Sequence, residues 1–170
     1  MKANLLRAEL AQNADVIQKL LAGVTQENAQ QRPDTESWSI LEVVCHLYDE
    51  EREDFRQRLD ILLHRPSDPW PPINPAGWVT ERNYNTQNLA EMFEKWLDER
   101  QQSLAWIDSL SAPDWVTKHP TPLGFEMAAG DMFASWVAHD ILHLRQLVEL
   151  RYMRATRITW PYDIRYAGDW

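Results

Sequence analysis

The stretch MFASWVAHDILHLRQLVEL, residues 132–150, decides the fold that we predict for this chain. Large side chains recur in it every three or four residues, as at Trp136, His139 and His143, which is the period of one face of an α-helix. The two histidines are four residues apart, so their rings lie one turn apart on the same face and can converge on one point. The stretch therefore predicts a long helix, over about residues 128–152, that carries two candidate metal ligands.

Three more segments show the same period, and the chain has only five glycines. The predicted helices cover, approximately, residues 5–22, 40–64, 86–110 and 128–152. The second helix has the clearest start, because Ser39-Ile40-Leu41-Glu42 matches a capping box. The pattern predicts an all-α protein of one domain, residues 1–170, built as a four-helix bundle.

The segments between these helices are predicted to be irregular. Residues 65–84 contain five prolines together with Trp70 and Trp78, and a connection of this length is often functional. Two interpretations of it stay open: a stiff aromatic cover at the mouth of the bundle, or a variable surface loop pinned by its tryptophans. Residues 111–127 and the tail, residues 153–170, are predicted to have no regular structure.

Composition narrows the classes of function. The formal net charge of -9 argues against a nucleic-acid partner, because phosphate binding needs a basic surface. The outer face of the third predicted helix, which includes Arg100, is interpreted as solvated. No apolar run approaches the ~18 residues that a membrane span needs, and the N-terminal residues lack the apolar segment of a signal peptide. The one cysteine, Cys45, fits a reducing compartment, so we expect a cytoplasmic protein with no membrane contact.

A third histidine completes a candidate metal site. His46 borders the apolar side of the second helix, and facing helices of a bundle are where metal sites are built. Taken singly, His46 is more commonly a partly buried residue with a hydrogen-bond partner, and chance or packing can also place two histidines four residues apart. Three imidazoles on inward lines would be costly to bury without a partner, and one divalent ion explains all three. We therefore predict a metal site of His46, His139 and His143, with open positions where a water or a substrate thiol can bind with a lowered pKa.

Two carboxylates near these histidines are candidates for proton transfer, or for orienting a ring or a bound water. Glu50 lies one turn after His46, and Asp140 follows His139 directly. Gln146, in the turn after the histidine pair, is a further candidate for orienting a ring. The alternative for Glu50 and Asp140 is an ordinary solvated helix charge, and for Asp140 this alternative is slightly favoured.

The other histidines and the cysteine are predicted to lie outside the site. His64 falls at a helix end and His119 in a loop, and both are interpreted as surface residues. Cys45 points about 100° away from His46 around the helix and is interpreted as a small core residue.

The spacing His-Asp-x-x-His is similar to the His-Glu-x-x-His of zinc proteases, but aspartate is one carbon shorter and no sheet is predicted. A carboxylate-bridged di-iron site needs two Glu-x-x-His motifs, which the chain lacks.

Three stretches, taken in their order and spacing, carry a family resemblance. They are Arg32-Pro33 with Trp38-Ser39-Ile40-Leu41-Glu42, His46-Leu47 and Glu50; His139-Asp140-x-x-His143 with Gln146-Leu147; and Tyr166-Ala167-Gly168-Asp169-Trp170. Together they resemble the DinB-like superfamily, which includes the YfiT-type metal-dependent hydrolases. One position departs from the family's pattern, because Arg145 stands where a glycine is common before the glutamine.

The resemblance implies a four-helix bundle with up-down-down-up topology. It implies a three-histidine site, carried onto His46, His139 and His143, that usually holds zinc or nickel. It also implies a homodimer, and activities that include transfer or isomerisation dependent on low-molecular-weight thiols.

We therefore expect a metal-dependent enzyme, a hydrolase or a thiol-dependent transferase, that acts on a small molecule. The ion is expected at the mouth of the bundle, with Glu50 as the first candidate for a general base. The substrate is expected to enter between the helix ends and the loop from Trp70 to Trp78. Two alternatives stay open. One is a non-catalytic, stress-related protein that binds metal or a small ligand, and the other is a scaffold with vestigial histidines whose apolar surface serves dimerisation.

Overall fold

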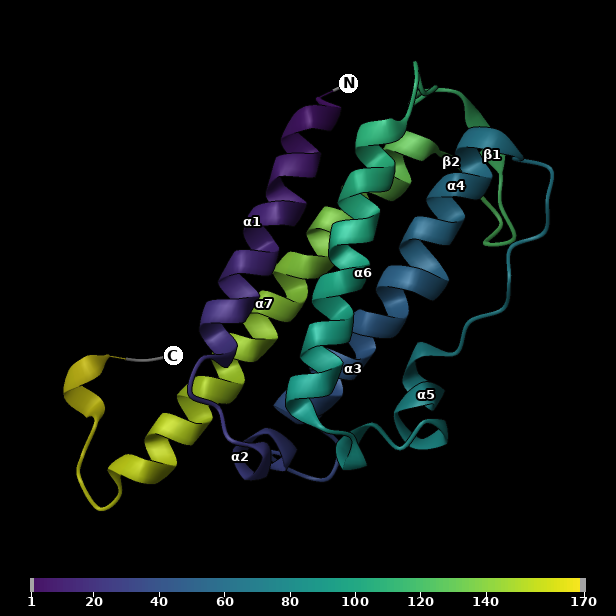
Figure 1. Cartoon of the computed structure of the whole chain (residues 1–170). Helices are drawn as coiled ribbons and strands as arrows, with labels where there is room; N and C mark the ends of the chain where they lie inside the picture. Colours follow the sequence, from purple (N-terminus) through teal and green to yellow (C-terminus); the bar gives the residue numbers. More distant parts are fainter. Residues whose placement is uncertain (1, 169–170) are drawn as a thin grey trace.

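The computed structural model describes residues 2–168, and its main feature is a set of four helical rods that lie side by side (Figure 1). The rods are α1 (Ala3–Leu21), α3 (Ile40–Asp49) with its continuation, α6 (Leu89–Ser109) and α7 (Ala129–Thr159). The second rod continues from α3 through the π-helical segment η1 (Glu50–Phe55) into α4 (Arg56–His64). The connections contain the short elements α2 (Gln26–Gln30), α5 (Pro75–Glu81), η2 (Tyr84–Thr86), β1 (Lys118–Pro120), β2 (Glu126–Ala128) and η3 (Arg165–Ala167).

The rods have the up-down-down-up order that the family resemblance implied. α1 and α7 run in one direction, and the α3–α4 rod and α6 run in the other (Figure 1). Two consecutive rods are therefore parallel, and residues 65–88 carry the chain back along the length of the bundle between them. The prediction of an all-α four-helix bundle is confirmed. The antiparallel hairpin of β1 and β2 was not predicted.

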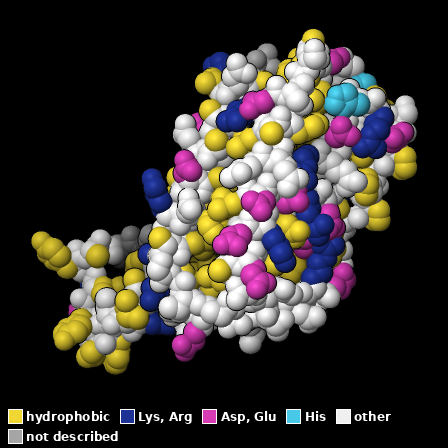
Figure 2. Space-filling model, viewed as in Figure 1, with side chains coloured by type: hydrophobic (Ala, Val, Ile, Leu, Met, Phe, Trp, Pro, Cys, Tyr) yellow, Lys and Arg dark blue, Asp and Glu magenta, His cyan; other side chains and the backbone are white. Residues whose placement is uncertain are grey.

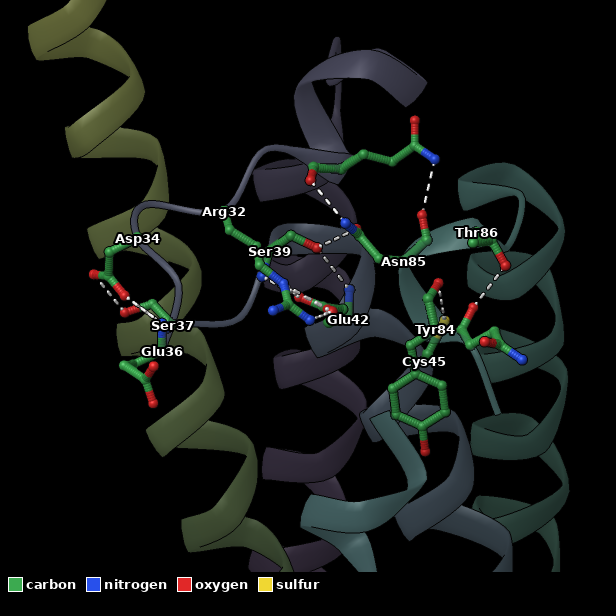
Figure 3. A network of polar contacts seen from close by, with 12 residues as sticks. Arg32, Asp34, Glu36, Ser37, Ser39, Glu42, Cys45, Tyr84, Asn85 and Thr86 are labelled. Carbon is green, nitrogen blue, oxygen red and sulfur yellow. Dashed lines mark hydrogen bonds and ion pairs between the residues drawn. The ribbon is translucent and has the colours of Figure 1, made fainter. Parts of the chain in front are cut away.

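The predicted capping box starts α3 and ties it to its neighbours (Figure 3). Ser39 Oγ accepts a hydrogen bond from the Glu42 amide at 3.2 Å, and Glu42 Oε2 accepts one from the Ser39 amide at 2.7 Å. The guanidinium of Arg32 pairs with the buried Glu42 carboxylate, and Ser39 Oγ donates to Asn85 Oδ1 at 2.8 Å. These bonds satisfy the backbone amides of Ser39 and Glu42 at the start of the helix and hold the rod that carries His46 in place.

The segment η1 interrupts the α-helical hydrogen bonding of the second rod without ending it. A π-helical turn is wider than an α-helical one, accommodates an extra residue and is frequently found at functional sites. Four of its six side chains are buried: Glu50, Glu51, Asp54 and Phe55. The sequence predicted an unbroken helix over residues 40–64 and missed this segment, because a run of acidic residues carries no apolar period to distinguish the two kinds of turn.

The core consists of two apolar clusters with a polar layer between them. One cluster includes Ile17, Val43, Trp96 and Leu147, and the other includes Leu10, Leu59, Phe133 and Trp136. On each rod, the buried polar residue of the layer lies between residues of the two clusters along the chain. These layer residues are Asn13, Glu51, Arg100 and Asp140. The layer is thus midway along the bundle, and every rod contributes to it.

The connection from residue 65 to residue 84 is folded, which corrects the prediction that it is irregular. Helix α5 buries Trp78 and Val79 in the first core cluster, and the guanidinium of Arg82 lies 4.0 Å from the Trp78 ring centroid. Trp70 packs against the second cluster, with Arg58 over its ring. The tryptophans pin this connection to the bundle, so the interpretation of a surface loop pinned by its tryptophans fits better than that of a cover over the site.

Helix α7 continues to Thr159, so the prediction that the tail is irregular from residue 153 is wrong. Beyond this helix the chain leaves the bundle and exposes large apolar side chains, among them Trp160 and Tyr162, at the edge of the molecule (Figures 1 and 2).

Asp169 and Trp170, which belong to the ending that supported the family resemblance, lie outside the described residues. Within residues 2–168, no helix combines the length and the apolar character that crossing a membrane requires.

Candidate metal centre

Three imidazoles from two rods converge in the polar layer. His46 comes from α3, and His139 and His143 come from successive turns of α7. The Nε2 atom of His139 lies 3.3 Å from Nε2 of His46 and 3.1 Å from Nε2 of His143. All three rings offer ligand atoms that lie within 4.8 Å of one another. The structure therefore brings together the three residues that the sequence singled out.

This spacing fits a single metal ion. Ligand nitrogens at about 2.0–2.1 Å from a tetrahedral zinc ion are about 3.3–3.4 Å apart, and a 90° ligand angle brings them to about 2.9 Å. The distances of 3.3 and 3.1 Å fall in this range. Hydrogen bonding alone explains the cluster less well, because the one ring nitrogen of His139 faces both other rings and carries at most one proton. A cation at the centre satisfies all three lone pairs at once.

The rings are in the protonation state that metal binding needs. Burial, followed by the charge of His143, lowers the pKa of His46 to about 3. Burial and the two neighbouring histidines lower the pKa of His139 to about 2, and burial also lowers the pKa of His143. Neutral imidazoles at neutral pH are ligands, whereas protonated ones are not.

Gln146 selects the tautomer of one ring, as its position in the sequence suggested. Its Oε1 lies 2.8 Å from Nδ1 of His143. A carbonyl oxygen accepts, so the proton of this imidazole sits on Nδ1 and the lone pair of Nε2 points toward the other two rings. Nδ1 of His46 is buried and has no protein partner among residues 2–168.

Two aromatic residues that were not predicted to belong to the site line it. The ring centroid of Trp38 lies 4.9 Å from that of His46, and its plane is parallel to that of His143 at 6.5 Å. Phe55, in η1, lies 4.8 Å from His139. One of the two open interpretations of residues 65–84 was a cover at the mouth of the bundle, but Trp78 belongs to the first core cluster. The expected place of the ion also needs correction, because the histidines lie midway along the bundle rather than at its mouth.

Glu50 is buried in η1, one turn after His46. Burial, followed by the neighbouring Asp54, raises its pKa to about 8, and its Oε1 has no protein partner among the described residues. Asp54 forms an ion pair with Arg58 at 2.7 Å. The alternative for Glu50, an ordinary solvated helix charge, is therefore wrong. Its carboxylate does not belong to the group of converging ligand atoms, so it is not a fourth ligand of the three-histidine cluster.

Asp140 is buried as well, which overturns the slightly favoured interpretation of a solvated charge. Both of its oxygens accept hydrogen bonds from Arg100, at 2.6 and 2.9 Å. Arg100 also donates to both oxygens of Glu51, at 2.9 and 2.8 Å, and the prediction that Arg100 lies on a solvated face is wrong. The ion-paired group of Arg100, Glu51 and Asp140 anchors α7 directly beside His139.

The other residues lie where they were predicted, with one change. His64 is exposed and pairs with Asp60, and Cys45 is fully buried. Burial raises the pKa of the Cys45 thiol to about 12, so it is neither a thiolate ligand nor a nucleophile. His119 is part of β1 rather than of a loop. Arg145, at the position where the family commonly has a glycine, points to solvent and pairs with Glu149.

The fold and the site define a helical bundle with a candidate three-histidine metal centre. The family model of the DinB superfamily matches residues 9–147, a range that includes all three histidines. This chain belongs to the DinB superfamily.

One solved structure shows how far the fold is shared. It is YfiT from Bacillus subtilis, described as a probable metal-dependent hydrolase with an unusual four-helix bundle topology. The two chains are 14% identical and superpose with a TM-score of 0.77, over 93% of this chain and 88% of YfiT. No curated protein matches this chain by sequence. The similarity to YfiT establishes the shared fold.

Proposed function

We propose that this protein is a metal-dependent hydrolase that acts on a small molecule. His46, His139 and His143 would hold one divalent ion, with zinc or nickel as the expected metals. The observation that carries the proposal is the convergence of three neutral Nε2 atoms at the spacing that one ion requires. The description of YfiT as a probable metal-dependent hydrolase supports hydrolysis as the reaction class.

The bound ion would supply Lewis acidity, with coordination positions left open for substrate. The residues around it prepare the site before substrate arrives. Gln146 keeps the proton of His143 on Nδ1, and Trp38 and Phe55 shield the rings of His46 and His139 from water. His46 and His143 are buried, whereas His139 is partly exposed, so we propose that substrate approaches from the side of His139.

We propose Glu50 as the group that exchanges protons with substrate or water. A pKa near 8 keeps its carboxyl mostly protonated at neutral pH and close to the value at which proton transfer in both directions is efficient. The free Oε1 leaves one oxygen available for this role. Asp140 has a different role in this proposal, because Arg100 occupies its oxygens. It positions His139 and does not transfer protons.

The experiment starts with metal analysis of protein purified without a histidine tag. We expect one divalent ion per chain in the wild type, loss of the ion in His143→Ala, and retention in the matched control His64→Ala. Absence of a bound ion after incubation with zinc and nickel would contradict the proposal and favour a scaffold.

Activity is then measured against panels of small esters and amides, and separately against conjugates of low-molecular-weight thiols. Hydrolysis that His46→Ala abolishes, while circular dichroism shows an intact fold, supports the proposal. Activity on thiol conjugates alone would instead identify a thiol-dependent transferase. A metal-loaded protein that is inert in every panel would favour a binding protein. The homodimer and the cytoplasmic location stay predictions.

A further inference from the structure

A small pocket lies between the start of α3, the α2 region and the last turns of α7. Its polar lining consists of Asn28, Gln31, Arg154 and Arg157, and its apolar lining includes Ile40 and Leu150. The pocket has a volume of about 20 Å³. This is room for about one or two water molecules, so the pocket admits one polar headgroup and not a whole nucleotide.

The two arginines in this pocket, like Arg151 one turn earlier, lack the carboxylate partner that the other described arginines have. Every described arginine outside the last turns of α7 forms an ion pair with a carboxylate. Among residues 2–168, no ion pair joins Arg154 or Arg157 to a carboxylate, although the formal net charge is -9. Arg151, one turn earlier, donates to the backbone carbonyl of Leu20 instead.

The local contacts leave both guanidiniums available to a ligand. Nε of Arg154 is buried and has no protein hydrogen-bond partner among the described residues. Nη2 of Arg157 is 3.5 Å from the carbonyl oxygen of Pro33, which keeps this side chain beside the pocket. A buried donor on a charged group is costly to leave without an acceptor, so the pocket favours a ligand that accepts hydrogen bonds.

The acidic residues nearby do not fill this role. The Asp34 carboxylate accepts hydrogen bonds from the amides of Glu36 and Ser37 and from the Ser37 hydroxyl, within its own loop (Figure 3). The charge of Glu36 acts on Arg32 and raises the pKa of that guanidinium, after the larger effects of Glu42 and of burial. Neither Glu27, in α2, nor Glu36 pairs with either pocket arginine.

We propose that this pocket binds one oxyanion group, the carboxylate or phosphoryl end of a small molecule. The planar guanidinium matches both groups with paired N–H donors, and the amides of Asn28 and Gln31 can supply further donors. The pocket is separate from the metal centre. Ile40 precedes His46 by six residues and Leu150 follows His143 by seven, so the two sites are about 9–11 Å apart along the helices.

The test uses the full chain, freed of metal, in buffers of constant ionic strength. Inorganic phosphate and acetate are titrated separately against a chloride reference, and binding is followed by calorimetry and by amide chemical shifts. We expect saturable binding of at least one of the two oxyanions, and the preferred one identifies the group. His143→Ala is expected to bind it equally well, which separates this site from the metal centre.

Two variants locate the binding. Arg157→Gln removes an exposed guanidinium, and Arg154→Lys keeps the charge while removing the buried Nε–H. Each is expected to weaken binding about tenfold or more, as for the loss of a hydrogen bond to a charged group. The matched control is Arg145→Gln, which removes an exposed guanidinium from the same helix outside the pocket. Oxyanion binding no tighter than chloride binding, or equal weakening in Arg157→Gln and Arg145→Gln, would overturn the proposal.

Discussion

Arg100 in α6 and Asp140 in α7 meet in the middle of the bundle, with both side chains almost fully buried and joined by hydrogen bonds of 2.6 and 2.9 Å. The same guanidinium holds both oxygens of Glu51 and donates to the Leu10 carbonyl. One arginine thus connects all four rods at the level of the histidines. Because Asp140 adjoins His139, this connection also fixes the turn of α7 that supplies a candidate ligand.

Removing Arg100 is therefore expected to be costly. Arg100→Met leaves the carboxylates of Glu51 and Asp140 buried without their partner, and we expect the free energy of unfolding to fall by about 3–5 kcal/mol. Urea denaturation at neutral pH measures this loss. Arg7→Gln, which breaks the more exposed pair with Asp108, is the control and should cost at most about 1 kcal/mol. Similar losses of unfolding free energy in the two variants would show that the buried network stabilises the fold no more than a surface ion pair does.

Gln146 is expected to tune metal affinity without being a ligand. Gln146→Leu removes the acceptor that holds the His143 proton on Nδ1, so the metal-binding tautomer is no longer selected. We expect zinc affinity to fall about 10–100-fold, as for other groups that orient a ligand. Competition with a chelating dye measures the affinity. Gln102→Leu, on the exposed face of α6, provides the control, and an unchanged affinity in Gln146→Leu would refute this role.

Acid is expected to destabilise the metal-free protein through its buried histidines. The pKa of His139 is about 2 in the folded chain and 6.5 in its ordinary state, so between these values the unfolded chain binds the proton and the folded chain does not. The contribution of His139 to the free energy of unfolding is therefore fully present above pH 6.5. It is lost as the pH falls below this value, by up to about 1.4 kcal/mol per pH unit.

Urea denaturation of the wild type and of His139→Phe, between pH 7 and pH 4, isolates this contribution. The variant lacks the titrating ring, so its stability should depend less steeply on pH. Parallel curves for the wild type and His139→Phe would contradict the predicted linkage.

The ionisation of Glu50 is expected to change the stability of the protein with pH in the opposite direction to that of His139. Its pKa is about 8 in the folded chain against an ordinary 4.5, so between these values the folded chain holds the extra proton. The contribution of Glu50 to the free energy of unfolding is therefore fully present below pH 4.5. It is lost as the pH rises through 8, by up to about 1.4 kcal/mol per pH unit. Glu50→Gln does not titrate, and its stability relative to the wild type should therefore increase between pH 5 and pH 9. A difference that stays constant over this range would show that Glu50 is ionised throughout.

Much of the architecture could be predicted from the sequence. The apolar periods of the four rods predicted their number and approximate bounds, and Ser39 with Glu42 predicted the start of α3. The pairing of His139 with His143 also followed, because it depends only on helix geometry. In contrast, α5 and the hairpin were missed, since their segments are short and rich in proline or polar residues.

Predictions failed where charged residues turned out to be buried. Arg100 was interpreted as solvated, this interpretation was slightly favoured for Asp140, and for Glu50 it stayed open as an alternative, because an isolated charge is seldom buried. In the folded chain the cost of burying each residue is reduced. Arg100 and Asp140 form an ion pair, and the raised pKa of Glu50 favours its uncharged form. A sequence pattern records the polarity of a residue but not the partner that compensates its burial.

By itself, the sequence determined the helices, the cap that starts α3 and the histidine pair of α7, because these depend on interactions across three or four residues of one chain segment. Only the tertiary structure decided that His46 meets this pair from 93 residues away, and that Arg100 reaches Asp140 across 40 residues. It also decided that the site lies in a polar layer midway along the bundle. Such contacts depend on how whole rods are directed and packed against one another. The spacing of apolar residues within one rod does not specify this arrangement.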